Sequence, residues 1–195
     1  MAGTEKPLLA EMKENAYLVL AFLGVMWLVL LLGFVIPGGA RSWGIEPRTI
    51  LGLRGIVFAP FVHANVFHLI ANTVPFAVLG YLVTMHGQGT FLRVTAFVVV
   101  VGGLLTWLLA RTAMHVGASG LIMGYLGYLL ARGWSERSLG SLVIAVIAFL
   151  FYGGALWGIT PLVPPFVSWE MHLFGFVAGI LAARTPAIGG AVAGR

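Results

Sequence analysis

Six runs of apolar residues fill most of this chain of 195 residues: roughly 16 to 36, 66 to 85, 91 to 110, 118 to 132, 139 to 160, and 169 to 184. A helix needs about 20 such residues to cross the hydrocarbon core of a bilayer. Composition agrees, because 60% of the residues are hydrophobic and 9% are charged, whereas a soluble domain carries about 25% charged residues. The sequence therefore predicts an all-α membrane protein, one bundle of six transmembrane helices.

The bundle is expected to span residues 16–185, between an N-terminal tail of residues 1–15 and a flexible C-terminal tail of residues 186–195. Cytoplasmic loops are enriched in Lys and Arg. With an inward N-terminus, seven basic residues fall on the inner side and four on the outer side. The inner residues are Lys6, Lys13, Arg93, Arg132, Arg137, Arg184 and Arg195, and the outer ones are Arg41, Arg48, Arg54 and Arg111. We therefore expect a multi-pass protein of the bacterial cytoplasmic membrane with both termini in the cytoplasm.

The longest connection, about residues 37 to 65, is rich in Gly and Pro and falls on the outer side. It carries Trp43, Phe58 and Phe61, and aromatic residues of this kind favour the membrane–water interface. We expect this segment to lie at the outer interface.

Several classes of chemistry are excluded by what the sequence lacks. It contains no Cys and no Asp, which removes disulfides, thiolate chemistry and a pair of catalytic aspartates. There is no His-Glu-x-x-His zinc motif, and both lysines lie in the N-terminal tail, which argues against a Ser–Lys dyad. The net charge of +5 is spread thinly, so nucleic-acid binding is not expected. A serine activated by a histidine remains.

Ser119 is the candidate nucleophile, within Gly117-Ala118-Ser119-Gly120 at the start of the fourth apolar run. Backbone N–H groups at the start of a helix have no partner within that helix and can face a developing oxyanion. The small neighbours leave room for a substrate to approach the hydroxyl.

His68 and Asn72 are spaced i and i+4, which places both on one face of the second apolar run. Their side chains can therefore donate hydrogen bonds into the same cavity. A polar group beside a lipid-embedded stretch is costly when it has no partner and is a functional candidate by default.

His172 begins a stripe with Gly175 and Gly179 in the sixth run, and Gly120, Gly124 and Gly127 form a similar stripe in the fourth. Small residues at such spacing let two membrane helices approach closely. We expect this contact to bring His172 within hydrogen-bonding distance of Ser119, as a dyad without a carboxylate.

In these motifs the chain resembles the rhomboid family of intramembrane serine proteases. The family pattern is His-x-x-x-x-His-x-x-x-Asn, Gly-x-Ser-Gly and His-x-x-Gly-x-x-x-Gly on three helices of a six-helix core. The matching residues here are His63, His68 and Asn72, then Gly117 to Gly120, then His172, Gly175 and Gly179. The order and spacing of the motifs are kept over nearly the whole chain.

The resemblance implies that Ser119 is the nucleophile and His172 the base, with His68, Asn72 and the Ser119 amide binding the oxyanion and His63 supporting them. Substrates would be transmembrane segments of other membrane proteins, cut near the outer face of the bilayer beside a small residue. The resemblance implies no metal and no organic cofactor. Met123 stands where the family commonly has Tyr or Phe stacked on the catalytic imidazole, and a thioether can still pack against a ring.

Each motif also has a structural explanation when taken alone. Ser119 could be a small helix-packing residue, and His68 with Asn72 could link helices by hydrogen bonds. Glu170 is expected to interact with the helix dipole rather than with His172, because residues i and i+2 point apart. His86 and His115 are expected in loops at the membrane surface.

The alternative function is a non-catalytic rhomboid-like protein that binds transmembrane helices. A small transporter would need an inverted repeat, which the sequence does not have. The conjunction of the three motifs favours the protease.

Overall fold

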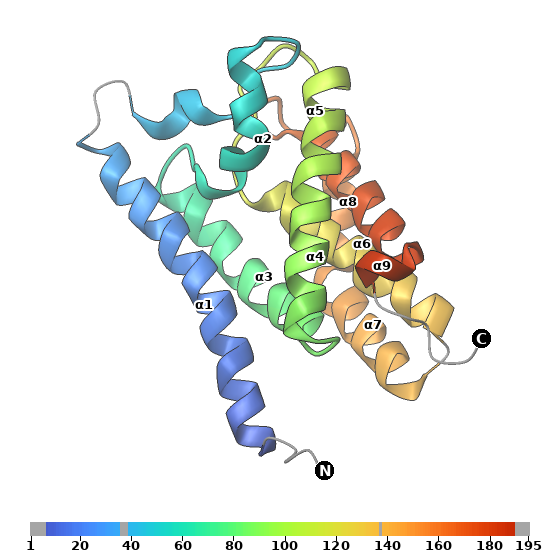
Figure 1. Ribbon diagram of the computed structural model, residues 1–195. Coiled ribbons are helices and arrows are strands. Elements are labelled where there is room, and N and C mark those ends of the chain that lie inside the picture. Colours follow the sequence, from blue (N-terminus) through green and yellow to red (C-terminus); the bar gives the residue numbers. More distant parts are fainter. Residues whose placement is uncertain (1–6, 36–38, 137, 190–195) are drawn as a thin grey trace.

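The computed structural model describes residues 7–35, 39–136 and 138–189, and within them the fold is all α (Figure 1). The main α-helices are α1 (Leu8–Gly33), α3 (Val66–Thr84), α4 (Gln88–Phe97), α5 (Gly103–Leu109), α6 (Ser119–Glu136), α7 (Leu139–Tyr152) and α8 (Trp169–Arg184). Shorter helices are η1 (Ala40–Trp43), η2 (Leu51–Arg54), α2 (Gly55–Phe58), η3 (Ala59–Phe61), η4 (Val98–Gly102), η5 (Gly153–Ile159) and α9 (Pro186–Gly189). The expected all-α helical bundle is confirmed.

Four helical segments among the described residues are long and apolar enough to cross a membrane: Leu8–Gly33, Val66–Thr84, Gln88–Leu109 and Leu139–Ile159. Gln88–Leu109 joins α4 and α5 through η4, a turn of π-helix. The other two expected spans correspond to α6 and α8, with 18 and 16 residues. These two do not meet that criterion, and α6 ends in the charged pair Arg132 and Glu136. The protein is an integral membrane protein, but helix length and apolarity alone do not reproduce the count of six.

Helix α1 begins at Leu8, so residues 8–15 of the expected tail are helical. These residues are mostly strong helix formers such as Leu, Ala, Glu and Met. Asn15 is buried and accepts a hydrogen bond from the Gln88 side chain over 3.1 Å, which links this first part of α1 to the start of α4. At the other terminus, residues 186–189 form α9, and residues 190–195 of the expected tail lie outside the described residues.

The short helices between residues 40 and 61 gather at the end of the bundle where α5 ends (Figure 1). The Arg48 guanidinium donates to the carbonyls of Ala110 (2.7 Å) and Leu108 (3.3 Å), which closes the end of α5. The Trp43 ring packs edge-on against Phe58, and Arg54 lies 5.1 Å from the Trp43 ring centroid. The expected interfacial segment is therefore a folded cap rather than an extended loop.

Helix α6 lies at the centre of the bundle. Its residues from Gly120 to Leu129 are all buried, and it packs against α3, α7 and α8. A methyl group at Gly175 would collide with the Gly120 carbonyl oxygen, and one at Gly179 with the Gly124 carbonyl oxygen. Gly127 lies against the Phe176 carbonyl. The backbones of α6 and α8 are therefore in direct contact along these glycines.

Candidate active site

Ser119 is the first residue of α6 and follows a turn that two hydrogen bonds hold in place. Gly117 adopts φ = +113°, a left-handed conformation that favours glycine. Its N–H donates to the Ala59 carbonyl over 2.9 Å. The next N–H, that of Ala118, donates to Nε2 of His63 over 3.3 Å. The turn is thus tied to η3 and to the segment before α3.

His172 lies in the first turn of α8 and points toward Ser119. Its Nε2 is 2.7 Å from Ser119 Oγ, and its Nδ1 is 3.0 Å from the carbonyl oxygen of Gly158 in η5. A carbonyl oxygen can only accept, so Nδ1 carries the proton and Nε2 presents a lone pair to the Ser119 hydroxyl. This is the tautomer that a general base requires.

His68 and Asn72 lie on α3 beside the turn that leads to Ser119. A methyl group at Gly117 would be 2.7 Å from His68 Nε2 and 3.6 Å from Asn72 Nδ2, so both side chains face the backbone of this turn. Asn65 caps α3 by accepting from the His68 N–H over 2.9 Å. Asn72 Nδ2 donates to the His68 carbonyl over 3.1 Å, which uses one of its two amide hydrogens and leaves the other for a ligand.

His63 is buried against this group, with its ring 5.1 Å from the His68 ring, centroid to centroid. Burial lowers the pKa of His63 from 6.5 to about 4, and the neighbouring His68 adds to the effect. The imidazole is therefore neutral at pH 7, which its role as acceptor for the Ala118 N–H requires.

A cavity of about 350 Å³ opens beside the side chains of Ser119 and His172. Its lining is mostly apolar and includes Ile122, Met123, Leu126, Trp157 and Val163, with Ser119, His172 and Asn72 as the polar members that the sequence singles out. Met123 and the His172 imidazole thus line the same cavity. An apolar cavity with a few convergent polar groups is the usual form of a ligand site.

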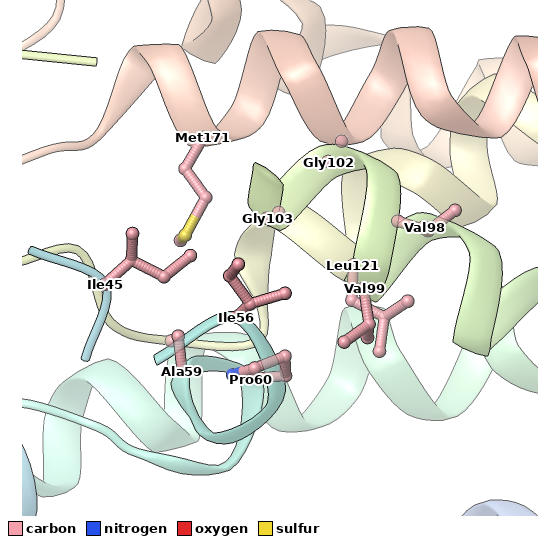
Figure 2. Close-up of a pocket in the computed structure, with 13 residues that line it drawn as sticks. Ile45, Ile56, Ala59, Pro60, Val98, Val99, Gly102, Gly103, Leu121 and Met171 are labelled. Atoms are coloured by element: carbon pink, nitrogen blue, oxygen red, sulfur yellow. The ribbon is translucent and has the colours of Figure 1, made fainter. Parts of the chain in front are cut away.

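A second, smaller cavity of about 30 Å³ adjoins the turn and is lined by Gly117, Gly120 and apolar side chains of the cap (residues 40–61) and of the π-helical turn. Figure 2 shows Met171, the residue before His172, pointing into it opposite Ile45 and Ile56. Apolar side chains from several elements thus lie around this turn.

Two groups near Ser119 and His172 lie outside the motifs identified in the sequence: the Gly158 carbonyl and His115. The Gly158 carbonyl orients His172, but every residue has a carbonyl and nothing in the sequence marks this one. His115 lies between α5 and α6, as expected of a loop residue, but it is buried, with only 1% of its surface exposed. It hydrogen-bonds Ser168 and the Arg111 carbonyl, and burial lowers its pKa.

The other two polar residues discussed from the sequence have partners away from Ser119. Glu170 is buried, and its Oε1 lies 3.6 Å from Arg111 Nε. His86 packs edge-on against Tyr128, at the end of α3 opposite His68, and is largely covered there rather than exposed on the surface. Among the described residues, no group of three or more His, Cys, Asp or Glu side chains could hold a metal ion.

Comparison of this sequence with known proteins identifies its family. Residues 51–187 match the model of the rhomboid domain. An uncharacterized protein of Mycobacterium tuberculosis is 40% identical over 173 residues, covering 85% of this chain and 72% of the relative. RHOMBOID-like protein 7 of Arabidopsis thaliana is 30% identical over 151 residues, 73% of this chain and 45% of the relative. A putative rhomboid protein of Acanthamoeba polyphaga mimivirus is 30% identical over 128 residues, 62% of this chain and 68% of the relative. The chain belongs to the rhomboid family.

Proposed function

We propose that this protein is an intramembrane serine endopeptidase that cuts transmembrane segments of other membrane proteins near the outer face of the membrane. The observation that carries the proposal is the 2.7 Å contact between Ser119 Oγ and His172 Nε2, beside an apolar cavity of about 350 Å³. Membership of the rhomboid family supports the same activity.

In the proposed reaction, Ser119 Oγ attacks the carbonyl carbon of the scissile peptide bond while His172 Nε2 takes the hydroxyl proton. The C–N bond then breaks, and the same proton passes from Nε2 to the leaving amine. A water molecule, deprotonated by His172, attacks the acyl group on Ser119. The bond between the acyl carbon and Ser119 Oγ breaks, the new carboxyl end leaves, and His172 Nε2 returns the water proton to Ser119 Oγ.

The negative charge on the substrate oxygen would be stabilised by three N–H groups. These are the Ser119 amide at the start of α6, the His68 imidazole and the free hydrogen of the Asn72 amide. The imidazolium formed on His172 would be stabilised by the Gly158 carbonyl, which takes the place of a triad carboxylate.

A covalent probe tests the nucleophile directly. Purified protein in detergent should react with a fluorophosphonate at Ser119 and cleave a model transmembrane substrate. Ser119→Ala should abolish both reactions, and His172→Ala should nearly do so. Ser135→Ala, which changes an exposed serine far along α6, is the matched control and should retain both. Labelling that survives Ser119→Ala would refute the assignment.

Asn72→Ala separates oxyanion stabilisation from nucleophile activation. We expect the cleavage rate to fall by about 10- to 1000-fold, the scale for the loss of one oxyanion donor. A rate equal to that of the wild type would remove Asn72 from the mechanism. If the wild-type protein binds the model substrate but neither cleaves it nor reacts with the probe, the chain is instead a non-catalytic binder of transmembrane helices.

A further inference from the structure

The turn that carries Ser119 and the helix that carries His172 are joined a second time, four residues earlier in each segment. His115 precedes Ser119 by four residues, and Ser168 precedes His172 by four. His115 Nδ1 lies 2.5 Å from Ser168 Oγ. This contact connects the same two segments as the contact between Ser119 and His172. We propose that His115 and Ser168 are a positioning pair that fixes the distance between nucleophile and base; the proposal rests on the proposed function of Ser119 and His172.

The hydrogen bonds of this pair are consistent with a single arrangement of protons. His115 Nε2 lies 3.1 Å from the Arg111 carbonyl, which can only accept, so Nε2 carries the proton. Nδ1 is then an acceptor, and the Ser168 hydroxyl donates to it. The Ser168 oxygen in turn accepts from the Met171 N–H at the start of α8, over 3.3 Å. One hydroxyl therefore joins the imidazole to the first turn of α8.

The His115 end of the link is held firmly. The backbone N–H and carbonyl of His115 pair with those of Ile45 in both directions, over 2.9 Å each. The side chain is 1% exposed, so an imidazole that lost its partner could not turn to water. A link to such a fixed residue can restrain the helix at its other end.

The segment that contains Ser168, just before α8, has few other contacts to hold it. The segment before α8 is exposed, with Leu162 at 72% and Phe166 at 89%, and packs little against the rest of the protein. The Arg111 guanidinium donates to the carbonyls of Pro165 (3.0 Å) and Val167 (2.7 Å), a second link from the same turn to the same segment. Together these links set where α8 begins and therefore where His172 lies.

The first test measures catalysis in variants of the pair. Ser168→Ala and His115→Ala should each lower kcat by about 10- to 100-fold, since a displacement of about 1 Å can cost about 100-fold. KM should change less than twofold. Ser168→Thr keeps the hydroxyl and should restore kcat to near the wild-type value. The double variant should lose no more than the worse single variant, because both substitutions break one link.

A matched control separates positioning from helix capping. Ser138 caps α7 in the same way, by accepting from the Ser141 N–H, but lies at the opposite end of α6 from Ser119. Ser138→Ala removes a comparable N-cap and should leave kcat unchanged. The inference is overturned if Ser168→Ala and Ser138→Ala have the same effect on kcat, or if the losses of His115→Ala and Ser168→Ala multiply in the double variant.

A readout without catalysis keeps this inference separate from the proposed function. Histidine-selective ¹⁵N NMR of the full chain reports which ring nitrogen of His172 carries the proton. Ser168→Ala should shift the His172 signals, whereas Ser168→Thr and Ser138→Ala should not. Unshifted signals in Ser168→Ala would overturn the pair even if the enzyme is active. Failure of the wild type to react with a fluorophosphonate would overturn only the proposed function. If His115→Ala does not fold, Ser168→Ala and Ser168→Thr carry the test alone.

Discussion

At the scale of single residues, the orientation of His172 depends on a backbone carbonyl rather than on a carboxylate. The Gly158 oxygen accepts from Nδ1 over 3.0 Å and leaves Nε2 free to face Ser119. The motifs around Ser119, His172, His68 and Asn72 could be predicted because each residue type carries its own chemistry. The Gly158 contact could not, because it depends on where η5 lies relative to α8.

Gly158→Ala should disturb this orientation without removing any polar group. A methyl group there would lie 3.1 Å from His172 Nδ1, so the imidazole must move by a few tenths of an ångström. We expect fluorophosphonate labelling of Ser119 to slow by about 10-fold. Gly140→Ala is the control, because a methyl group at Gly140 meets nothing within 4 Å. Equal labelling rates in the two variants would contradict the orienting role of Gly158.

His63 should make folding sensitive to acid. The folded protein lowers its pKa from 6.5 to about 4, so in this range the unfolded chain binds more protons than the folded one. Its contribution to stability is therefore complete above about pH 6.5 and is lost as the pH falls toward about 4. In His63→Gln, an amide oxygen can accept from Ala118 without titrating. The unfolding midpoint of this variant should fall less steeply with acidification than that of the wild type, as measured by thermal melts in detergent. Parallel curves would show that His63 does not titrate in this way.

At the scale of helices, the glycines of α6 and α8 let two backbones meet, and this contact carries Ser119 and His172 toward each other. The sequence predicts both glycine stripes because small residues recur at helical spacing. Hydropathy does not place the start of α1 at Leu8, because Glu11, Lys13 and Glu14 interrupt the apolar run there, although these residue types favour a helix. Nor does it predict the π-helical turn of η4, where the third span packs against Gly124 and Gly175.

Gly175→Ala should weaken this packing and the catalysis together. The added methyl group would meet the Gly120 carbonyl, one residue after Ser119, and the backbone cannot yield as a flexible side chain can. Overpacking of this kind costs about 1–3 kcal/mol. We expect a lower unfolding midpoint and slower probe labelling. Gly24→Ala on α1, where a methyl group meets nothing within 4 Å, should change neither. A Gly175→Ala protein with wild-type stability would mean that the helices can separate without loss.

At the scale of the whole molecule, the start of α6 and the cap formed by residues 40–61 lie toward one end of the bundle, and the end of α6 and the start of α7 lie toward the other (Figure 1). The bias of basic residues predicts which end faces outward. The chain has no cysteine, so a single introduced thiol reports its own side of the membrane. Ser42→Cys in the cap and Ser135→Cys near the end of α6 both replace exposed serines. In intact cells a membrane-impermeant maleimide should label Ser42→Cys and not Ser135→Cys, and both should react after the membrane is permeabilised. The opposite pattern would place the proposed cleavage site on the cytoplasmic side and would reverse the predicted positions of both termini.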